Sequence, residues 1–222
     1  MSEERTIAFV DLAGFTALTE VHGDSAAVEL IDEFTATARQ AVDGIDATLV
    51  KTVGDAVMLA ACDPATALEA VRRVFEASYD TDTFLEPRGG LHHGPVLARE
   101  GDYFGATVNL AARVASQAGS GQTLGTAPVA AAAQTLRIDT VELGAYQLRN
   151  ILEPVELWAI ELCPTHIDTS IDPVCHMRVS CHAAVGRIRY AGAEHWLCSL
   201  DCVRQFAADP DRYLTPGDTP QS

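Results

Sequence analysis

Short apolar segments alternate with amphipathic helical patterns over most of the chain, and this alternation limits the folds that the chain can adopt. TIAFVDLAGF, residues 6–15, is typical of a buried strand that runs into a turn. DATLVKTV and AVMLAAC predict a hairpin closed at Gly54 and Asp55. A helical stretch is predicted after Gly14, with an interruption at Gly23 and a second part over residues 25–42. Further helices are predicted over residues 64–79 and 106–118. We therefore expect an α/β (α+β) sandwich with the helices on one face of the sheet.

The composition narrows the classes of function. A formal net charge of −16 argues against binding to nucleic acid and to anionic membranes. No apolar run reaches the roughly 18 residues of a membrane helix. The start, MSEERTIAFV, lacks the basic and apolar stretches of a signal peptide. We therefore expect a cytoplasmic protein without membrane insertion.

Cysteines gather near the C-terminus, where the composition changes. Four of the six cysteines lie in the last 50 residues, and in a cytoplasmic chain they are expected to be thiols or metal ligands. The polar break CPTHIDTS separates this part from the preceding strands and helices. The predicted division is a first domain at 1–163, a linker at 164–170, a small Cys-rich domain at 171–216 and a tail at 217–222.

Four motifs in the first domain carry unusual polar residues. FVDLAGFT ends an apolar strand with Asp11, where an unpaired carboxylate is costly, and KTVGD places Asp55 at the hairpin tip. GDYFG places Asp102 beside aromatic residues, and VNLAAR brings Asn109 and Arg113 to one helical face. Taken singly, each motif is also compatible with a cap, a turn or a solvated helix face.

Taken together and in this order, the motifs resemble the class III nucleotidyl cyclase domain. The resemblance also includes GLHHGPV and LRNILEPVELWAI, and it extends over about residues 4–162. It implies a ferredoxin-like βαββαβ core with added strands. It also implies a head-to-tail homodimer with active sites at the interface between the subunits.

The resemblance makes Asp11 and Asp55 the ligands of two Mg²⁺ or Mn²⁺ ions in each active site. Such hard cations prefer oxygen ligands, and they relieve the repulsion between neighbouring carboxylates. They would stabilise the ribose 3′-oxygen and the leaving pyrophosphate during cyclisation. Backbone N–H groups at the start of the first helix are expected to bind phosphate, at Gly14, Phe15 and Thr16.

The other roles implied by the resemblance fall on the ribose, the phosphates and the base. Asn109 would orient the ribose, Arg113 would meet charge developing on the α-phosphate, and Arg149 would bind the triphosphate. Asn150 stands where the family commonly has glycine.

Lys51 and Asp102 would read the base. A lysine that only donates and a carboxylate that only accepts match adenine, and with exchanged roles they also match guanine. In the family this pair is the pattern of adenylate cyclases, so ATP is the expected substrate. Across a two-fold dimer, Asp55 would serve one site and Lys51 the other.

The C-terminal segment resembles the YHS family, which is related to metal-handling TRASH domains. The matching motifs are DPVC-x-M, Tyr190-x-Gly192, CS-x-x-C and DP-x-x-YL. The resemblance implies a Zn²⁺ or Cu⁺ site, because thiolates favour such ions. Its ligands would be Cys175, Cys198 and Cys202, with His176 or His195 as a possible fourth.

The leading hypothesis is an adenylate cyclase whose C-terminal domain responds to metal or redox state. A second hypothesis is a nucleotide-binding regulatory module with little turnover, and a third is a guanylate cyclase. A fourth is a metal-trafficking protein whose cyclase-like half serves only to dimerise.

Overall fold

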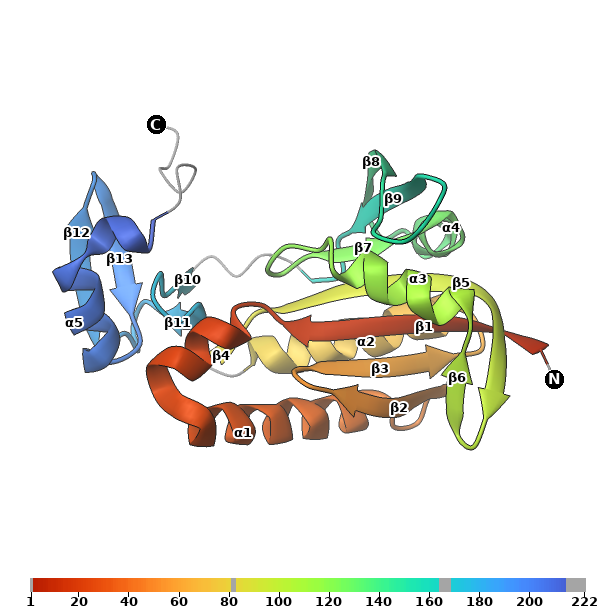
Figure 1. Ribbon diagram of the computed structural model, residues 1–222, viewed down its shortest axis with the longest axis horizontal. Coiled ribbons are helices and arrows are strands. Elements are labelled where there is room, and N and C mark those ends of the chain that lie inside the picture. Colours follow the sequence, from red (N-terminus) through yellow and green to blue (C-terminus); the bar gives the residue numbers. More distant parts are fainter. Residues whose placement is uncertain (1, 81–82, 164–168, 215–222) are drawn as a thin grey trace. The chain divides into compact units, whose positions relative to one another are not determined.

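The computed structural model describes residues 2–80, 83–163 and 169–214 (Figure 1). The chain forms two compact units, and neither is continuous in sequence. Unit 1 consists of Met1–Ala13, Glu33–Ser78 and Pro87–Pro164, and unit 2 of Gly14–Asp32, Tyr79–Glu86 and Thr165–Ser222. The predicted tail at 217–222 and most of the predicted linker lie outside the described residues.

Unit 1 is built on one mixed sheet of eight strands. Its first four strands run in the spatial order β2-β3-β1-β5 and pair antiparallel, as in a ferredoxin-like fold. They are β1 (Ser2–Leu12), β2 (Ala47–Val53), β3 (Ala56–Ala61) and β5 (Pro87–Arg99). With the helices between them, they give the predicted βαββαβ core.

Four strands extend this core. Beyond β5 the sheet continues in the order β7-β9-β8, and β6 pairs separately with β5. The β5–β7 pairing is parallel and the others in this extension are antiparallel. The added strands are β6 (Asp102–Phe104), β7 (Thr123–Gly125), β8 (Thr140–Tyr146) and β9 (Val155–Ile160).

Helices lie on both faces of this sheet, so the prediction of helices on one face is wrong. At Gly89 of β5, an added Cβ would lie 3.6 Å from the side chain of Val71 in α2 (Pro64–Tyr79). At Gly90, an added Cβ would lie 2.0 Å from the backbone nitrogen of Ala115 in α3 (Ala106–Ala115). Because successive residues of a strand point to opposite faces, α2 and α3 cover opposite sides, as Figure 1 shows.

The helices of the described chain are five in number. They are α1 (Phe15–Ala41), α2 (Pro64–Tyr79), α3 (Ala106–Ala115), α4 (Ala127–Thr135) and α5 (Leu200–Ala208). Helix α1 is bent at Gly23, whose φ of 82° and ψ of 170° are not helical. This bend is the interruption that the sequence predicts.

The position of β3 in the sheet explains why its sequence is a continuous apolar run rather than an alternating one. Val57, Met58 and Leu59 are all buried, with exposed fractions of 0, 0 and 1%. A strand covered on both faces needs apolar side chains on both faces.

Unit 2 combines a three-stranded sheet, a hairpin and α5. The sheet order is β10-β11-β4, and β4 comes from residues far from the C-terminal segment, with Leu85 opposite Met177. The strands are β4 (Thr83–Leu85), β10 (Thr169–Ile171), β11 (Met177–Ser180), β12 (Gly186–Tyr190) and β13 (Ala193–Leu197). A short 3₁₀ helix, Pro210–Arg212, follows α5. The domain boundary at residue 163 stays a prediction, because unit 2 also draws on earlier segments.

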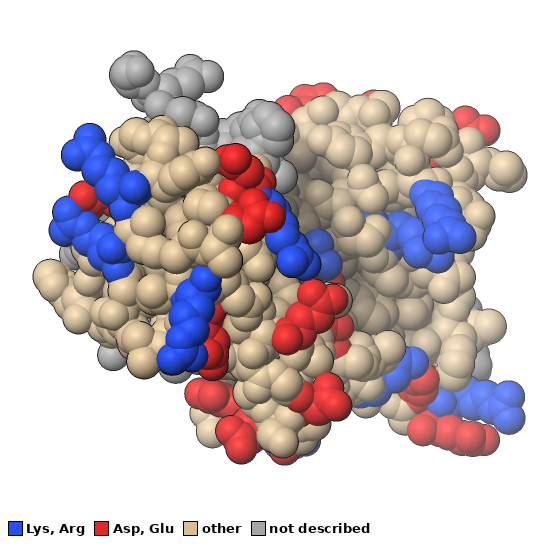
Figure 2. Space-filling view, turned by 60° about the vertical axis from the view of Figure 1, so that its left-hand side comes forward, with Lys and Arg blue, Asp and Glu red and all other residues tan. Residues whose placement is uncertain are grey.

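On the face shown in Figure 2, basic and acidic side chains form small interspersed groups. Among the described residues, no helix combines the length and the apolar character needed to cross a membrane.

Substituting Gly90 by alanine should destabilise the protein by about 1–3 kcal/mol, because the new methyl group would overlap the backbone of α3. Gly89→Ala is the matched control, since its Cβ would make only ordinary contacts of 3.5 Å or more. Urea unfolding measures both variants. Equal midpoints for the two variants would contradict the close approach of α3 to β5.

Candidate functional site

Asp11 and Asp55 lie together at one end of neighbouring strands. Asp11 is near the end of β1 and stands opposite Ala56, the first residue of β3, so Asp55 is one residue from this pair. Burial raises the pKa of Asp55, and the negative charge of Asp11 raises it further. The two carboxylates are therefore close enough to repel each other.

Arg88 binds the carboxylate of Asp11 with two hydrogen bonds. Its Nε donates to Oδ1 at 2.5 Å and its second guanidinium nitrogen donates to Oδ2 at 3.0 Å. The two residues are register partners between β1 and β5. The hydrogen bond with Asp11 also raises the pKa of Arg88. Arg88 was missed from the sequence, because its role depends on the register of β1 against β5.

The donor set of this site suits a hard cation. Two carboxylates offer oxygen ligands of the kind that Mg²⁺ and Mn²⁺ prefer. Arg88 supplies a positive charge where the acidic pair needs one, so the guanidinium acts as a cationic stand-in. A metal ion that binds Asp11 through both oxygens would have to replace these hydrogen bonds.

Lys51 pairs with Asp102 rather than with the nearby hairpin residue Asp55. Lys51 Nζ donates to Oδ2 of Asp102 at 2.6 Å, and Oδ1 accepts from the backbone N–H of Tyr103 at 2.8 Å. The ammonium also lies 5.7 Å from the ring centroid of Phe104. The hydrogen bond from Lys51 lowers the pKa of Asp102. The two residues predicted to read the base are thus neighbours in unit 1.

Asn109 and Arg113 occupy successive turns of α3, as their spacing predicts. Asn109 is exposed and Arg113 is half-buried. Within the described part of the chain, the Arg113 guanidinium makes no hydrogen bond or ion pair, which leaves its donors available for a ligand.

Arg149 is exposed in the segment between β8 and β9. The next residue, Asn150, has a φ of 62°, in the left-handed region that glycine and asparagine tolerate best. Asparagine is therefore compatible with the backbone conformation that this position adopts.

Gly14, Phe15 and Thr16 open α1 and belong to unit 2. Gly14 has a φ of 84°, which favours glycine, and it packs closely on His176. An added Cβ at Gly14 would lie 2.3 Å from Cβ of His176. The predicted phosphate-binding turn is thus in contact with the residue that follows Cys175.

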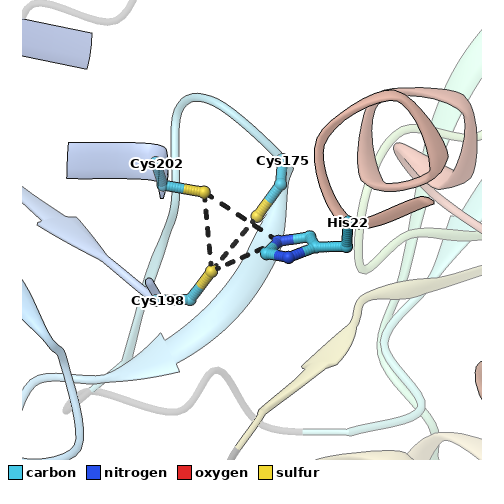
Figure 3. Close-up of side chains that lie close together, drawn as sticks. All are labelled: His22, Cys175, Cys198 and Cys202. Carbon is cyan, nitrogen blue, oxygen red and sulfur yellow. Dashed lines mark hydrogen bonds between the residues drawn. The ribbon is translucent and has the colours of Figure 1, made fainter. Parts of the chain in front are cut away.

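Three cysteines and one histidine form a compact cluster in unit 2 (Figure 3). The Sγ atom of Cys198 lies 3.4 Å from that of Cys175 and 3.7 Å from that of Cys202. The Nε2 atom of His22 lies 3.6 Å from Sγ of Cys198 and 3.9 Å from Sγ of Cys202. All four ligand atoms lie within 4.8 Å of one another, and the cysteines are free thiols.

Ser199 and the start of α5 set the positions of two of the cysteines. Ser199 caps α5 and accepts a hydrogen bond from the Cys202 N–H at 3.2 Å. Cys198 precedes this cap, so it is not on the helix. Hydrogen bonds with Cys175 and Cys198 lower the pKa of the Cys202 thiol.

The histidine in the cluster is His22, whereas the sequence motifs pointed to His176 and His195. His195 packs on Phe206 with ring centroids 5.0 Å apart, and its buried Nε2 has no hydrogen-bond partner among the described residues. His176, with a φ of 61°, packs on Gly14. No sequence signal connects His22 to cysteines more than 150 residues later.

The Asp172 side chain links the turn that carries Cys175 to the backbone of Cys198. Its carboxylate is fully buried and accepts hydrogen bonds from the N–H groups of Val174 and Cys198, each at 2.8 Å. Burial raises its pKa. This residue fixes the turn that carries Cys175 against the strand end that carries Cys198.

Comparisons with known proteins point to one family. Residues 1–161 match the family described as the adenylate and guanylate cyclase catalytic domain. An adenylate cyclase of Streptomyces griseus is 44% identical over 110 residues, which are 50% of this chain and 28% of that protein. An adenylate cyclase of Glutamicibacter nicotianae is 31% identical over 163 residues, covering 71% of this chain and 40% of that protein. The chain therefore spans less than half of the length of these relatives.

Solved structures show the same fold. An adenylate cyclase of Trypanosoma brucei, described in its monomeric state, superposes with a TM-score of 0.65 at 24% identity and covers 73% of this chain and 90% of that chain. The adenylyl cyclase CyaB of P. aeruginosa gives a TM-score of 0.61 at 21% identity, with 77% and 98% covered.

Asp55→Asn should raise the melting temperature slightly at neutral pH without divalent cations. The folded-state pKa of Asp55 is raised, so its protonated form is favoured by folding and its ionised form weakens the fold above that pKa. The gain should shrink as the pH falls through the pKa of Asp55, where the wild-type residue becomes neutral.

Asp102→Asn is the control, and it should lower the melting temperature at neutral pH. The pKa of Asp102 is lowered in the folded protein, so folding favours its ionised form. Thermal unfolding at neutral and acidic pH measures both variants. A lower melting temperature for Asp55→Asn at neutral pH would contradict the crowded acidic pair.

Proposed function

The chain belongs to the family of adenylate and guanylate cyclase catalytic domains, and we propose on this basis that it is an adenylate cyclase. It would convert ATP into 3′,5′-cyclic AMP and pyrophosphate. The observation that carries this proposal is the acidic pair of Asp11 and Asp55, held at one end of two paired strands beside Arg88.

The acidic pair would hold two Mg²⁺ or Mn²⁺ ions. When bound, these ions would stabilise charge on the ribose 3′-oxygen and on the triphosphate. Asp11 would give up its hydrogen bonds with Arg88 to act as a ligand. Arg88 would then be free to bind an anion, and its position on β5 beside Asp11 favours a phosphate oxygen.

The other residues of the site would bind and orient the nucleotide. Arg113 has donors available for the α-phosphate, where negative charge grows in the transition state. Asn109, one turn earlier on the same helix, would orient the ribose. Arg149 would bind the triphosphate. The N–H groups of the turn at the start of α1 would bind phosphate, at Gly14, Phe15 and Thr16.

Lys51 and Asp102 would select adenine. Lys51 offers donors for the N1 acceptor of adenine, and Asp102 offers an acceptor for the exocyclic amino group. Their mutual ion pair keeps both groups in place before the base arrives. The ion pair lies at the surface, so its exchange for a base costs little.

A homodimer would complete the site. Lys51 forms an ion pair with Asp102, while the charges of Asp11 and Arg88 act on the pKa of Asp55. One chain thus carries two separate sets of polar residues, which suits a head-to-tail dimer with one set from each subunit. A cytoplasmic location without partners among nucleic acids or membranes is part of the same proposal.

We also propose a soft-metal site for Zn²⁺ or Cu⁺ at Cys175, Cys198 and Cys202. The short distances between their sulfur atoms, without a disulfide, support it. This site alone would also suit a metal-trafficking protein. A nucleotide-binding module with little turnover and a guanylate cyclase are two further candidate functions, and one assay separates them from an adenylate cyclase.

Purified protein should form cyclic AMP from ATP with Mn²⁺, and more slowly form cyclic GMP from GTP. Asp11→Asn and Asp55→Asn should each lower turnover at least about a hundredfold, because the metal ligands are lost. Thermal unfolding shows that the variants remain folded. Bound ATP without product would favour the binding module, and faster turnover of GTP would favour the guanylate cyclase.

Mixing two inactive variants tests the shared site. Asp11→Ala and Lys51→Ala should each be inactive, and after subunit exchange their mixture should recover about a quarter of the wild-type activity. Half of the dimers are then mixed, and each mixed dimer has one intact site. Asp11→Ala mixed with Asp55→Ala is the matched control, since both changes fall on the same half-site and no mixed dimer is intact. Recovery in neither mixture, despite exchange, would contradict the proposed dimer.

A further inference from the structure

We propose that His22 is the fourth ligand of a site for a thiophilic ion of the Zn²⁺ type, with Cys175, Cys198 and Cys202. We further propose that the ion holds the start of α1 in place and so controls cyclase activity. The metal site stands on its own geometry. Its control of activity rests on the proposed function.

Four separations among the ligand atoms are close to those of a tetrahedral site. With Zn–S near 2.3 Å and Zn–N near 2.0–2.1 Å, regular tetrahedral geometry gives about 3.8 Å between sulfur atoms and about 3.6 Å between sulfur and nitrogen. The observed separations from Cys198 are 3.4 and 3.7 Å to sulfur and 3.6 Å to His22 Nε2. Cys202 Sγ lies 3.9 Å from His22 Nε2, and all four ligand atoms lie within 4.8 Å of one another, so modest adjustments would let them bind one ion.

The chemistry of the four ligands selects the class of ion. Three thiols and one imidazole form a soft donor set that suits Zn²⁺ and similar ions and does not suit Mg²⁺. Two of the cysteines, Cys175 and Cys202, are fully buried, and a set of four protein ligands is typical of closed structural sites. Asp172 fixes the backbone at Cys198 and Val174, as the outer shell of a metal site does.

The local structure of α1 brings His22 close to the three cysteines. Val21 packs against the buried cluster formed by Val174, Cys175, Leu197, Cys202 and Phe206. The helix bends at Gly23, immediately after His22. Figure 3 shows the imidazole of His22 pointing from α1 toward the three sulfur atoms. His22 thus reaches the cysteines by a local bend and by the packing of its neighbour.

The ion would fix both ends of the segment from Gly14 to His22. Gly14 packs on His176, which follows the ligand Cys175, and His22 would bind the ion directly. Asp11 is only three residues before Gly14, which is at most about 11 Å of extended chain. An ion at this site would therefore order the turn that is proposed to bind phosphate and restrict the chain that follows a catalytic carboxylate.

Metal binding can be tested apart from catalysis. Reduced, metal-free protein should bind one Zn²⁺ per chain, and His22→Ala should weaken the affinity at least about tenfold in competition with a chromophoric chelator. With Co²⁺ as the probe, wild type should show the intense d–d bands of tetrahedral coordination, and His22→Ala should shift these bands while the thiolate charge-transfer band remains. His22→Cys should restore tight binding.

His182→Ala and His195→Ala are the matched controls. His182 is an exposed histidine of the same unit, and His195 is a half-buried histidine outside the cluster, with its Nε2 buried. Both variants should bind Zn²⁺ and Co²⁺ like the wild type. Unchanged affinity and an unchanged Co²⁺ spectrum in His22→Ala would overturn the assignment of His22.

The effect on the helix and on activity needs two further measurements. Zn²⁺ should slow amide hydrogen exchange in residues 14–22 of the wild type and leave it unchanged in His22→Ala. Removing Zn²⁺ with a chelator that does not bind Mg²⁺ should lower kcat/KM for ATP several-fold in the wild type, and His22→Ala should be low with or without Zn²⁺.

The outcomes distinguish the two parts of the proposal. Slower exchange with unchanged or increased kcat/KM would overturn the control of activity. Unchanged exchange would overturn the ordering of α1. A protein that binds Zn²⁺ through His22 but makes no cyclic nucleotide would refute the proposed function and leave the metal site standing.

Discussion

The structure depends on a charge conflict between Asp11 and Asp55, two carboxylates that the sheet brings together. Burial and mutual repulsion raise the pKa of Asp55, and Arg88 offsets part of the charge through two hydrogen bonds with Asp11. A fold keeps such a pair only at some cost in stability. The strands bring the two carboxylates together, and positive charge from Arg88 or from a bound cation lowers the cost of their proximity.

Much of the fold could be predicted because the strand and helix patterns of the core are local. The apolar run of β3 and the bend at Gly23 appear directly in the sequence. The placement of helices on opposite faces of the sheet could not be predicted from helical periodicity. It is a matter of tertiary packing, such as the close contact of Gly90 with α3. The pairing of β4 with β11 joins distant segments and also left no local signal.

The residues of the candidate sites also fall into two groups, those that sequence motifs predicted and those that only the structure revealed. The acidic pair and the cysteines belong to short motifs with recognisable spacing, so they could be named from the sequence. Arg88 and His22 act through tertiary contacts, one set by strand register and the other by a bend in a helix. The left-handed φ of Asn150 could not be predicted either, because it is a property of the folded backbone.

The discontinuous make-up of unit 2 has a consequence for how such a protein can evolve or be shortened. Phe84 and Leu85 are buried in this unit although they precede the C-terminal segment by more than 80 residues. Cutting the chain after residue 163 would strip away the partners of β4 and of Val21 and leave apolar surface facing water. The C-terminal segment is thus no detachable accessory, and its gain or loss would require matching changes at Val21 and in β4.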